Sequence, residues 1–132
     1  MRKILLALAA SAILAAPAVA SPRLHGEAEL AKMLEGRTAG KPVDCIDLSR
    51  VQSSQIVDGT AIVYDMGRTL YVNRPRGGAE SLDNWSTMVL KPFDHELCRV
   101  DTVQLIDSGS HFYKGSVFLG DFVPYTKEHG TR

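Results

Sequence analysis

The chain has 132 residues, and its 15 lysines and arginines balance 15 aspartates and glutamates. The basic residues are scattered, so the sequence has no positive block of the kind that binds nucleic acid or an anionic membrane surface. A chain of this length is expected to form a single domain.

The N-terminus has the pattern of a secretory signal peptide. Arg2 and Lys3 give a positive start, and residues 4–16 form an unbroken run of apolar and small residues. About 13 apolar residues are too few to span roughly 30 Å of hydrocarbon, so a stable membrane anchor is not expected. Cleavage is predicted between Ala20 and Ser21. The mature chain would then have 112 residues, with 13 basic and 15 acidic side chains.

One helix is predicted over residues 26–40. Glu27 and Glu29 would lie in its first turn, where they complement the helix dipole. Its apolar residues recur at positions i, i+3 and i+4 and predict a core-facing stripe of Leu30, Met33 and Leu34. Either Gly36 or Gly40 can end the helix.

Short strands are predicted after Pro42. Residues 43–48 are the first, and residues 60–73 form the best hairpin, with a three-residue turn at 65–67. This turn would place three pairs opposite one another: Tyr64 and Arg68, Ile62 and Leu70, and Thr60 and Val72.

Three further strands are predicted at residues 85–92, 101–107 and 113–122, with a turn at 108–110. Residues 74–84 have the composition of a loop. The aromatic residues are expected mainly in the core, with the lining of a ligand pocket as the alternative: Tyr64, Tyr71, Trp85, Phe93, Phe112, Tyr113, Phe118 and Phe122.

These elements predict a mainly β domain, in which a small antiparallel sheet curls into a barrel or sandwich behind one N-terminal helix. The predicted organisation is a signal peptide at 1–20, a helical segment at 21–41, a β-rich domain at 42–125 and a mobile tail at 126–132.

The segment "DHELCRVD", residues 94–101, has the densest chemistry in the chain. Its cysteine, Cys98, has one possible partner, Cys45. Two cysteines in an exported chain are most simply one disulfide. Closing a loop of this length would add about 4 kcal/mol of stability in the chain-entropy description.

Two other roles for this segment are open from the sequence. A metal site would use His95 and Cys98 with Asp94 or Asp101, but zinc normally needs a second close pair of ligands. A cysteine nucleophile would need a histidine base beside it, such as His95 or His111. The sequence therefore predicts no catalytic residue, no metal and no cofactor.

The order "DCI", "VQSSQIVDGTAIVYDMGRTLYVNRP", "LCRVD" and "LGDFVPY" resembles a family of small exported bacterial proteins that carry a domain of unknown function. The resemblance covers roughly residues 42–125 and implies a periplasmic location. Relatives often have two further cysteines, at positions near Ala79 and Val117. Their joint absence here implies that they pair with each other, which supports pairing Cys45 with Cys98.

The predicted function is that of an exported, non-enzymatic domain that binds a protein partner, an envelope component or a small ligand. The alternatives are a small secreted hydrolase, a redox protein, or an inhibitor of an envelope-attacking enzyme. Arg74 and Arg76, in the glycine-rich loop, are the weak candidates for partner binding.

Overall fold

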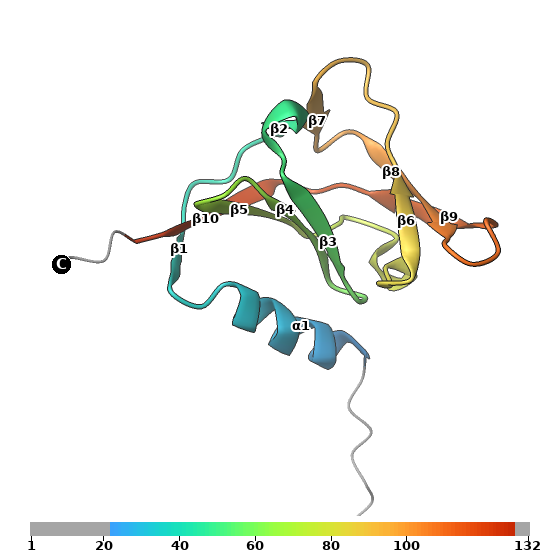
Figure 1. The fold of residues 1–132 in the computed structure, drawn as a ribbon, viewed down its shortest axis with the longest axis horizontal. Helices are drawn as coiled ribbons and strands as arrows, with labels where there is room; N and C mark the ends of the chain where they lie inside the picture. The colour runs from blue at the N-terminus through green and yellow to red at the C-terminus, as the bar shows by residue number, and fades with distance from the viewer. Residues whose placement is uncertain (1–21, 129–132) are drawn as a thin grey trace, which may run out of the picture.

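The computed structural model describes residues 22–128, so the predicted signal peptide, its cleavage site at Ala20 and Ser21, and residues 129–132 lie outside the described residues. The predicted mainly β fold is confirmed: ten strands form three antiparallel sheets, with one α-helix, in the described part. The sheets stack as a sandwich and do not close into a barrel (Figure 1). Within residues 22–128, no helix is long and apolar enough to cross a membrane.

The helix α1 spans Pro22–Met33, which is earlier than the sequence predicts. Glu27 therefore lies in the middle of the helix, and no acidic residue occupies the first turn. Proline at the start is favourable because its missing N–H would have no partner there. The predicted stripe is confirmed, since Leu30 is buried and both Met33 and Leu34 pack beside it. Gly36, with a φ of 70°, turns the chain into the first strand.

The largest sheet has five strands in the order β1-β10-β5-β4-β3, all antiparallel. Their bounds are Arg37–Ala39 for β1, Phe122–Lys127 for β10, Thr69–Asn73 for β5, Ala61–Asp65 for β4 and Ser53–Val57 for β3. Thr126 and Lys127, expected in the tail, instead pair with Thr38 and Arg37 of β1. The β-rich domain therefore extends beyond its predicted boundary.

Two smaller sheets pack against the face of the large sheet opposite α1 (Figure 1). One pairs β2 (Cys45–Asp47) with β7 (Glu96–Cys98), and the other has β6 (Ser86–Val89), β8 (Thr102–Asp107) and β9 (Tyr113–Phe118) in the order β6-β8-β9. Two short 3-10 helices, Leu48–Arg50 and Ala79–Ser81, lie in the connections.

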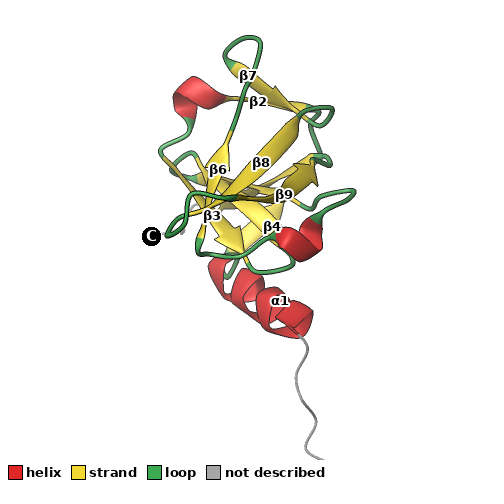
Figure 2. Ribbon diagram, turned by 90° about the vertical axis from the view of Figure 1, so that its right-hand side faces the viewer, coloured by secondary structure: helices red, strands yellow, loops and turns green. Residues whose placement is uncertain are grey.

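Two apolar clusters lie on opposite faces of the large sheet. The cluster under α1 joins Leu30 to Val63 and Val72, whereas the cluster between the sheets joins Ile62 and Tyr64 to the buried residues of the smaller sheets. The central strand β4 contributes to both clusters, so four of its successive residues are buried. Figure 2 shows α1 and the smaller sheets on opposite sides of this strand.

The predicted register of the β4–β5 hairpin is wrong. Tyr64 lies opposite Tyr71 rather than Arg68, Ile62 lies opposite Asn73 rather than Leu70, and Val72 lies opposite Val63 rather than Thr60. The turn is formed by Gly67 and Arg68, because the N–H of Met66 donates to the carbonyl of Thr69 at 3.0 Å. An odd shift in register moves side chains to the other face, so Leu70 and Val72 pack under α1.

The predicted strand at 113–122 is divided between two sheets. β9 ends at Phe118, and β10 begins in the large sheet at Phe122. At this crossing, the buried amide of Asn73 donates to the carbonyl of Gly120 at 2.7 Å and accepts from its N–H at 3.0 Å. This pair satisfies backbone groups that would otherwise be buried without partners.

Candidate functional site

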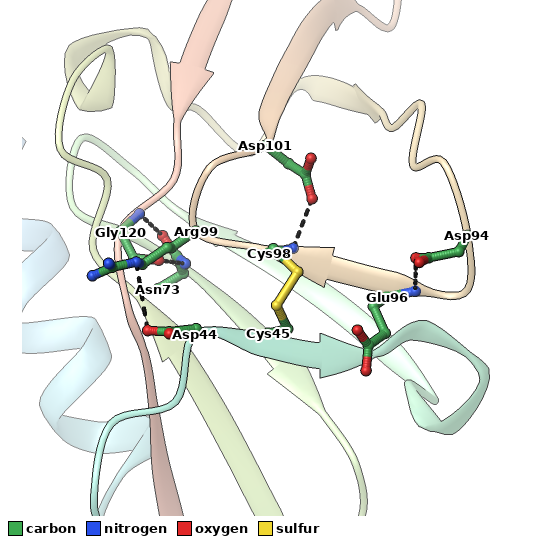
Figure 3. Close-up of a disulfide and its surroundings, with 9 residues drawn as sticks. All are labelled: Asp44, Cys45, Asn73, Asp94, Glu96, Cys98, Arg99, Asp101 and Gly120. Carbon is green, nitrogen blue, oxygen red and sulfur yellow. Dashed lines mark hydrogen bonds and ion pairs between the residues drawn. A yellow bond between two sulfur atoms is a disulfide. The ribbon is translucent and has the colours of Figure 1, made fainter.

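The cysteine-containing segment has a structural role. Cys45 of β2 lies directly opposite Cys98 of β7, and their sulfurs form a disulfide with an S–S distance of 2.00 Å (Figure 3). The predicted pairing is confirmed. Because both sulfurs are in the bridge, neither is available as a thiolate nucleophile or as a metal ligand together with the neighbouring Glu96.

The carboxylates of residues 94–101 mainly support the local backbone. Asp94 accepts a hydrogen bond from the N–H of Glu96 at 2.8 Å, and Asp101 accepts one from the N–H of Cys98 at 2.7 Å (Figure 3). Arg99 continues the strand pair, since its N–H donates to the carbonyl of Asp44 at 2.8 Å. The Arg99 contact extends the pairing of β7 with β2, whereas the two carboxylate contacts stay within residues 94–101.

The histidines do not form a catalytic set among the described residues. The side chains of His95 and His111 are exposed, and neither imidazole of these two makes a hydrogen bond within residues 22–128. Near His95, the hydroxyl of Ser49 donates to Asp47 at 2.6 Å, and this hydrogen bond lowers the pKa of Asp47. An activated serine needs a base that takes its proton, normally an imidazole. The partner of the Ser49 hydroxyl is instead the Asp47 carboxylate, whose lowered pKa makes it a weak base.

Arg74 and Arg76 both make contacts within the domain. Arg74 forms a two-pronged ion pair with Glu27 of α1, at 2.5 and 3.1 Å. Arg76 donates to the carbonyl of Leu119 at 2.7 Å and to that of Arg99 at 3.1 Å. The two side chains therefore tie their loop to the helix and to the β9–β10 connection. Their predicted role in partner binding stays a prediction.

A groove of about 410 Å³ lies between β3 and β6, each of which is the edge strand of its sheet. Its lining is polar and includes Ser54, Gln55 and Asn84. Glu29 is the one ionisable residue of that lining, and its carboxylate accepts a hydrogen bond from Gln55 at 3.3 Å. The groove therefore lacks the pair of ionisable groups that acid–base catalysis uses.

The three-stranded sheet leaves one face uncovered. Val103 and Leu105 of β8 are fully buried and face the core, so Thr102, Gln104 and Ile106 point outward. We call the surface formed by these outward positions and their neighbours on β6 and β9 the outer face. Its aromatic residues are more than half exposed, which shows that none of the described elements covers it.

Three aromatic rings stand on the outer face. Tyr113 lies opposite Ile106 and is 60% exposed, and Phe118 lies opposite Thr102 and is 51% exposed. Trp85, directly before β6, is 77% exposed, and its carbonyl accepts from the N–H of Ser108. These residues are predicted core positions that the structure places outside. An exposed aromatic patch of this kind is typical of an interaction surface.

The remaining members of the outer face are neutral. Val89 and Ile106 are half-buried aliphatic residues. The polar members carry hydroxyl or amide groups: Thr87, Thr102, Gln104, Ser108 and Ser116. Two hydrogen bonds fix these groups, one of 3.0 Å between the hydroxyls of Thr87 and Ser108 and one of 2.8 Å between those of Tyr113 and Ser116.

Charged residues beside the outer face are engaged with one another or with the backbone. Lys114 occupies the irregular position of β9 and forms an ion pair with Asp83. This contact lowers the pKa of Asp83. Asp107 accepts from the N–H groups of Gly109 and Ser110 in the β8–β9 turn. The paired outward positions of β6, β8 and β9 carry no charged side chain, and the exposed Lys91 lies two residues beyond Val89.

Comparisons with protein-family models, with curated proteins and with solved structures find no match for the chain.

Proposed function

We propose that this chain is an exported domain that binds an envelope component or a protein partner through the outer face of β6, β8 and β9 without catalysing a reaction. The observation that carries the proposal is the exposure of Trp85, Tyr113 and Phe118 on one uncovered sheet face. Burying these rings against a partner would be favourable, at about 25 cal/mol for each Å² of apolar surface removed from water.

Export rests on the signal-peptide pattern of residues 1–20. The bridge between Cys45 and Cys98 agrees with this location, because disulfides persist in oxidising compartments such as the periplasm. The resemblance to small exported bacterial proteins points the same way, and membership of that family is part of the proposal.

The enzymatic alternatives have less support. A hydrolase would need a histidine bonded to an acid or a nucleophile, and His95 and His111 have no such contact in the described part. A redox protein normally uses a close Cys-x-x-Cys pair, whereas these cysteines are 53 residues apart. The inhibitor hypothesis relied on a free Arg74–Arg76 loop, but both arginines hold that loop to the domain.

The test is site-specific photo-cross-linking in the cell that exports the protein. A photoreactive residue replaces Thr87, which is exposed on the edge strand β6 of the outer face, and a matched control carries it at Ala28 on the exposed side of α1. A discrete adduct is expected from position 87 and none from position 28, and Tyr113→Ala should reduce its yield. No adduct at 87, or equal adducts at both positions, would contradict the proposal.

A further inference from the structure

We infer that the outer face binds an extended, uncharged glycan chain, an inference that rests on the proposed use of this face for docking. Three properties of the face lead to this ligand class: its lack of charge, its neutral hydrogen-bonding groups, and the spacing of its aromatic rings.

The lack of charge restricts the ligand. A ligand with fixed charges would lose part of its hydration on the outer face without gaining a counter-charge, which is unfavourable. Three charged residues beside the face, Lys114, Asp83 and Asp107, already have partners. The face therefore suits a neutral molecule better than a nucleic acid, an anionic lipid or a charged peptide.

The polar groups match a polyhydroxylated ligand. A hydroxyl both donates and accepts hydrogen bonds, and an amide side chain presents both functions side by side. Gln104 and Thr102 of β8, with Ser116 of β9, offer such groups on the outward side. Sugar hydroxyls have the same dual character, so each contact can form in either direction.

The rings supply flat apolar surfaces on which the C–H face of a sugar ring can lie. Tyr113 and Phe118 lie opposite Ile106 and Thr102, which are four residues apart along β8. At about 3.3 Å for each residue of a strand, these two positions are about 13 Å apart along the sheet, and the Tyr113 ring extends from its position toward Ser116, whose hydroxyl it contacts. A ligand that runs along the face from the Ile106 position to the Thr102 position is a chain of several sugar units and not a single sugar.

The arrangement differs from that of a typical protein interface. Protein interfaces have an apolar, water-excluding centre within a polar rim. Here the polar pair Gln104 and Ser116 lies between the positions of Tyr113 and Phe118, and the Tyr113 hydroxyl contacts Ser116, so polar groups occupy the middle of the face. Glycan chains need polar contacts between their stacked rings, which favours a glycan over a protein surface.

Trp85 provides a direct test, because it is the one tryptophan of the chain and stands on the outer face. The purified protein is titrated with two uncharged probes, cellotetraose and N-acetylglucosamine tetramer, while tryptophan fluorescence is recorded. We expect a saturable change with at least one probe. Tyr113→Ala should weaken this binding about tenfold, because it removes one stacking surface and leaves the reporter in place.

The matched control is Phe93→Ala. Phe93 is 105% exposed in the connection between β6 and β7 and does not belong to the outer face, so its loss should leave the affinity unchanged. Thermal unfolding verifies that both variants fold. Equal weakening by both variants, or no weakening by Tyr113→Ala, would place the glycan elsewhere and overturn the inference.

A titration without any fluorescence change would also overturn the glycan inference. The cross-linking experiment at position 87 then tests the docking role of the outer face separately from the identity of its ligand. A position-specific adduct to a protein would leave the docking face standing with a different ligand class. The lack of any adduct would remove both proposals.

Discussion

The hydroxyl of Tyr64 is a buried polar group without a hydrogen-bond partner in the described structure. The side chain is 1% exposed and its ring packs 5.8 Å from that of Phe122, so burial raises the pKa of Tyr64 far above its usual value. Tyr64→Phe removes this group and keeps the ring. We expect the free energy of unfolding to stay the same or to rise by about 1 kcal/mol, measured by urea denaturation.

The control for that measurement is Tyr113→Phe, which removes an exposed hydroxyl and should change the stability by less than about 0.5 kcal/mol. A loss of more than about 1 kcal/mol in Tyr64→Phe would show that the buried hydroxyl has a partner, such as an internal water.

A substitution at Gly26 of α1 compares the cost of a close contact with the gain in helix propensity. A methyl group at this position would collide with the backbone carbonyl of Asp58 and the hydroxyl of Thr60. Alanine normally favours a helix over glycine by about 1 kcal/mol, but the collision should outweigh this gain. We therefore expect Gly26→Ala to destabilise the protein by about 1–3 kcal/mol in thermal or urea unfolding.

The comparison is Ala28→Gly, at an exposed position of the same helix, where propensity alone should cost about 1 kcal/mol. A Gly26→Ala variant that is more stable than the parent chain would mean that α1 does not rest on the β3–β4 turn.

Among the elements, the helix α1 is held to the domain partly by the ion pair of Glu27 and Arg74. The hydrogen bond from Arg74 lowers the pKa of Glu27 in the folded chain. The pair therefore stabilises the fold above the unfolded pKa of Glu27, about 4.3, and this contribution is lost as the pH falls through the lower folded value. Both side chains are about half exposed, which limits the contribution to about 1 kcal/mol or less.

Glu27→Gln should thus lower the free energy of unfolding at pH 7 by up to about 1 kcal/mol and make little difference near pH 2. Urea denaturation at both values, with Glu35→Gln at an exposed position after α1 as the control, measures the effect. An equal difference at pH 7 and pH 2 would contradict an ionic origin.

The sequence predicted which elements exist better than how they pair. The helical stripe, the short strands and the 108–110 turn all follow from local patterns, and the structure contains them. The register of the β4–β5 hairpin could not be obtained in this way. The strand β4 is buried on both faces, so its residues Ala61, Ile62, Val63 and Tyr64 show no alternation that would indicate which side faces which layer.

The outer face was missed for a related reason. Trp85, Tyr113 and Phe118 fit strand patterns, and aromatic residues in strands are usually buried. A signal was present in β8, where Val103 and Leu105 alternate with Thr102 and Gln104. To place Phe118 on the outer face from this alternation, one must know that it pairs with Thr102 and not with a core position. Pairing between strands is a long-range property that local patterns do not give.

For the molecule as a whole, the disulfide is the main covalent restraint. Replacing Cys45 and Cys98 by serine releases a loop with a sequence separation of 53 residues. The chain-entropy description gives a loss of about 4 kcal/mol, a large part of the net stability of a small domain. Urea denaturation of the double variant, compared with the oxidised parent chain, measures this loss. A change below about 1 kcal/mol would show that the unfolded chain is compact without the bridge.

The bridge also determines how the domain would respond to mechanical tension. A force applied through the ends of the chain passes from β2 to β7 across the two sulfurs and bypasses the segment between the two cysteines, whose sequence separation is 53. On unfolding under load, the oxidised protein should lengthen by roughly 180 Å less than the reduced one, since an extended residue spans about 3.5 Å. The enclosed part contains β6 and residue 85, the first aromatic position of the outer face. When the ends of the oxidised chain are extended, this enclosed segment is therefore shielded from the pull.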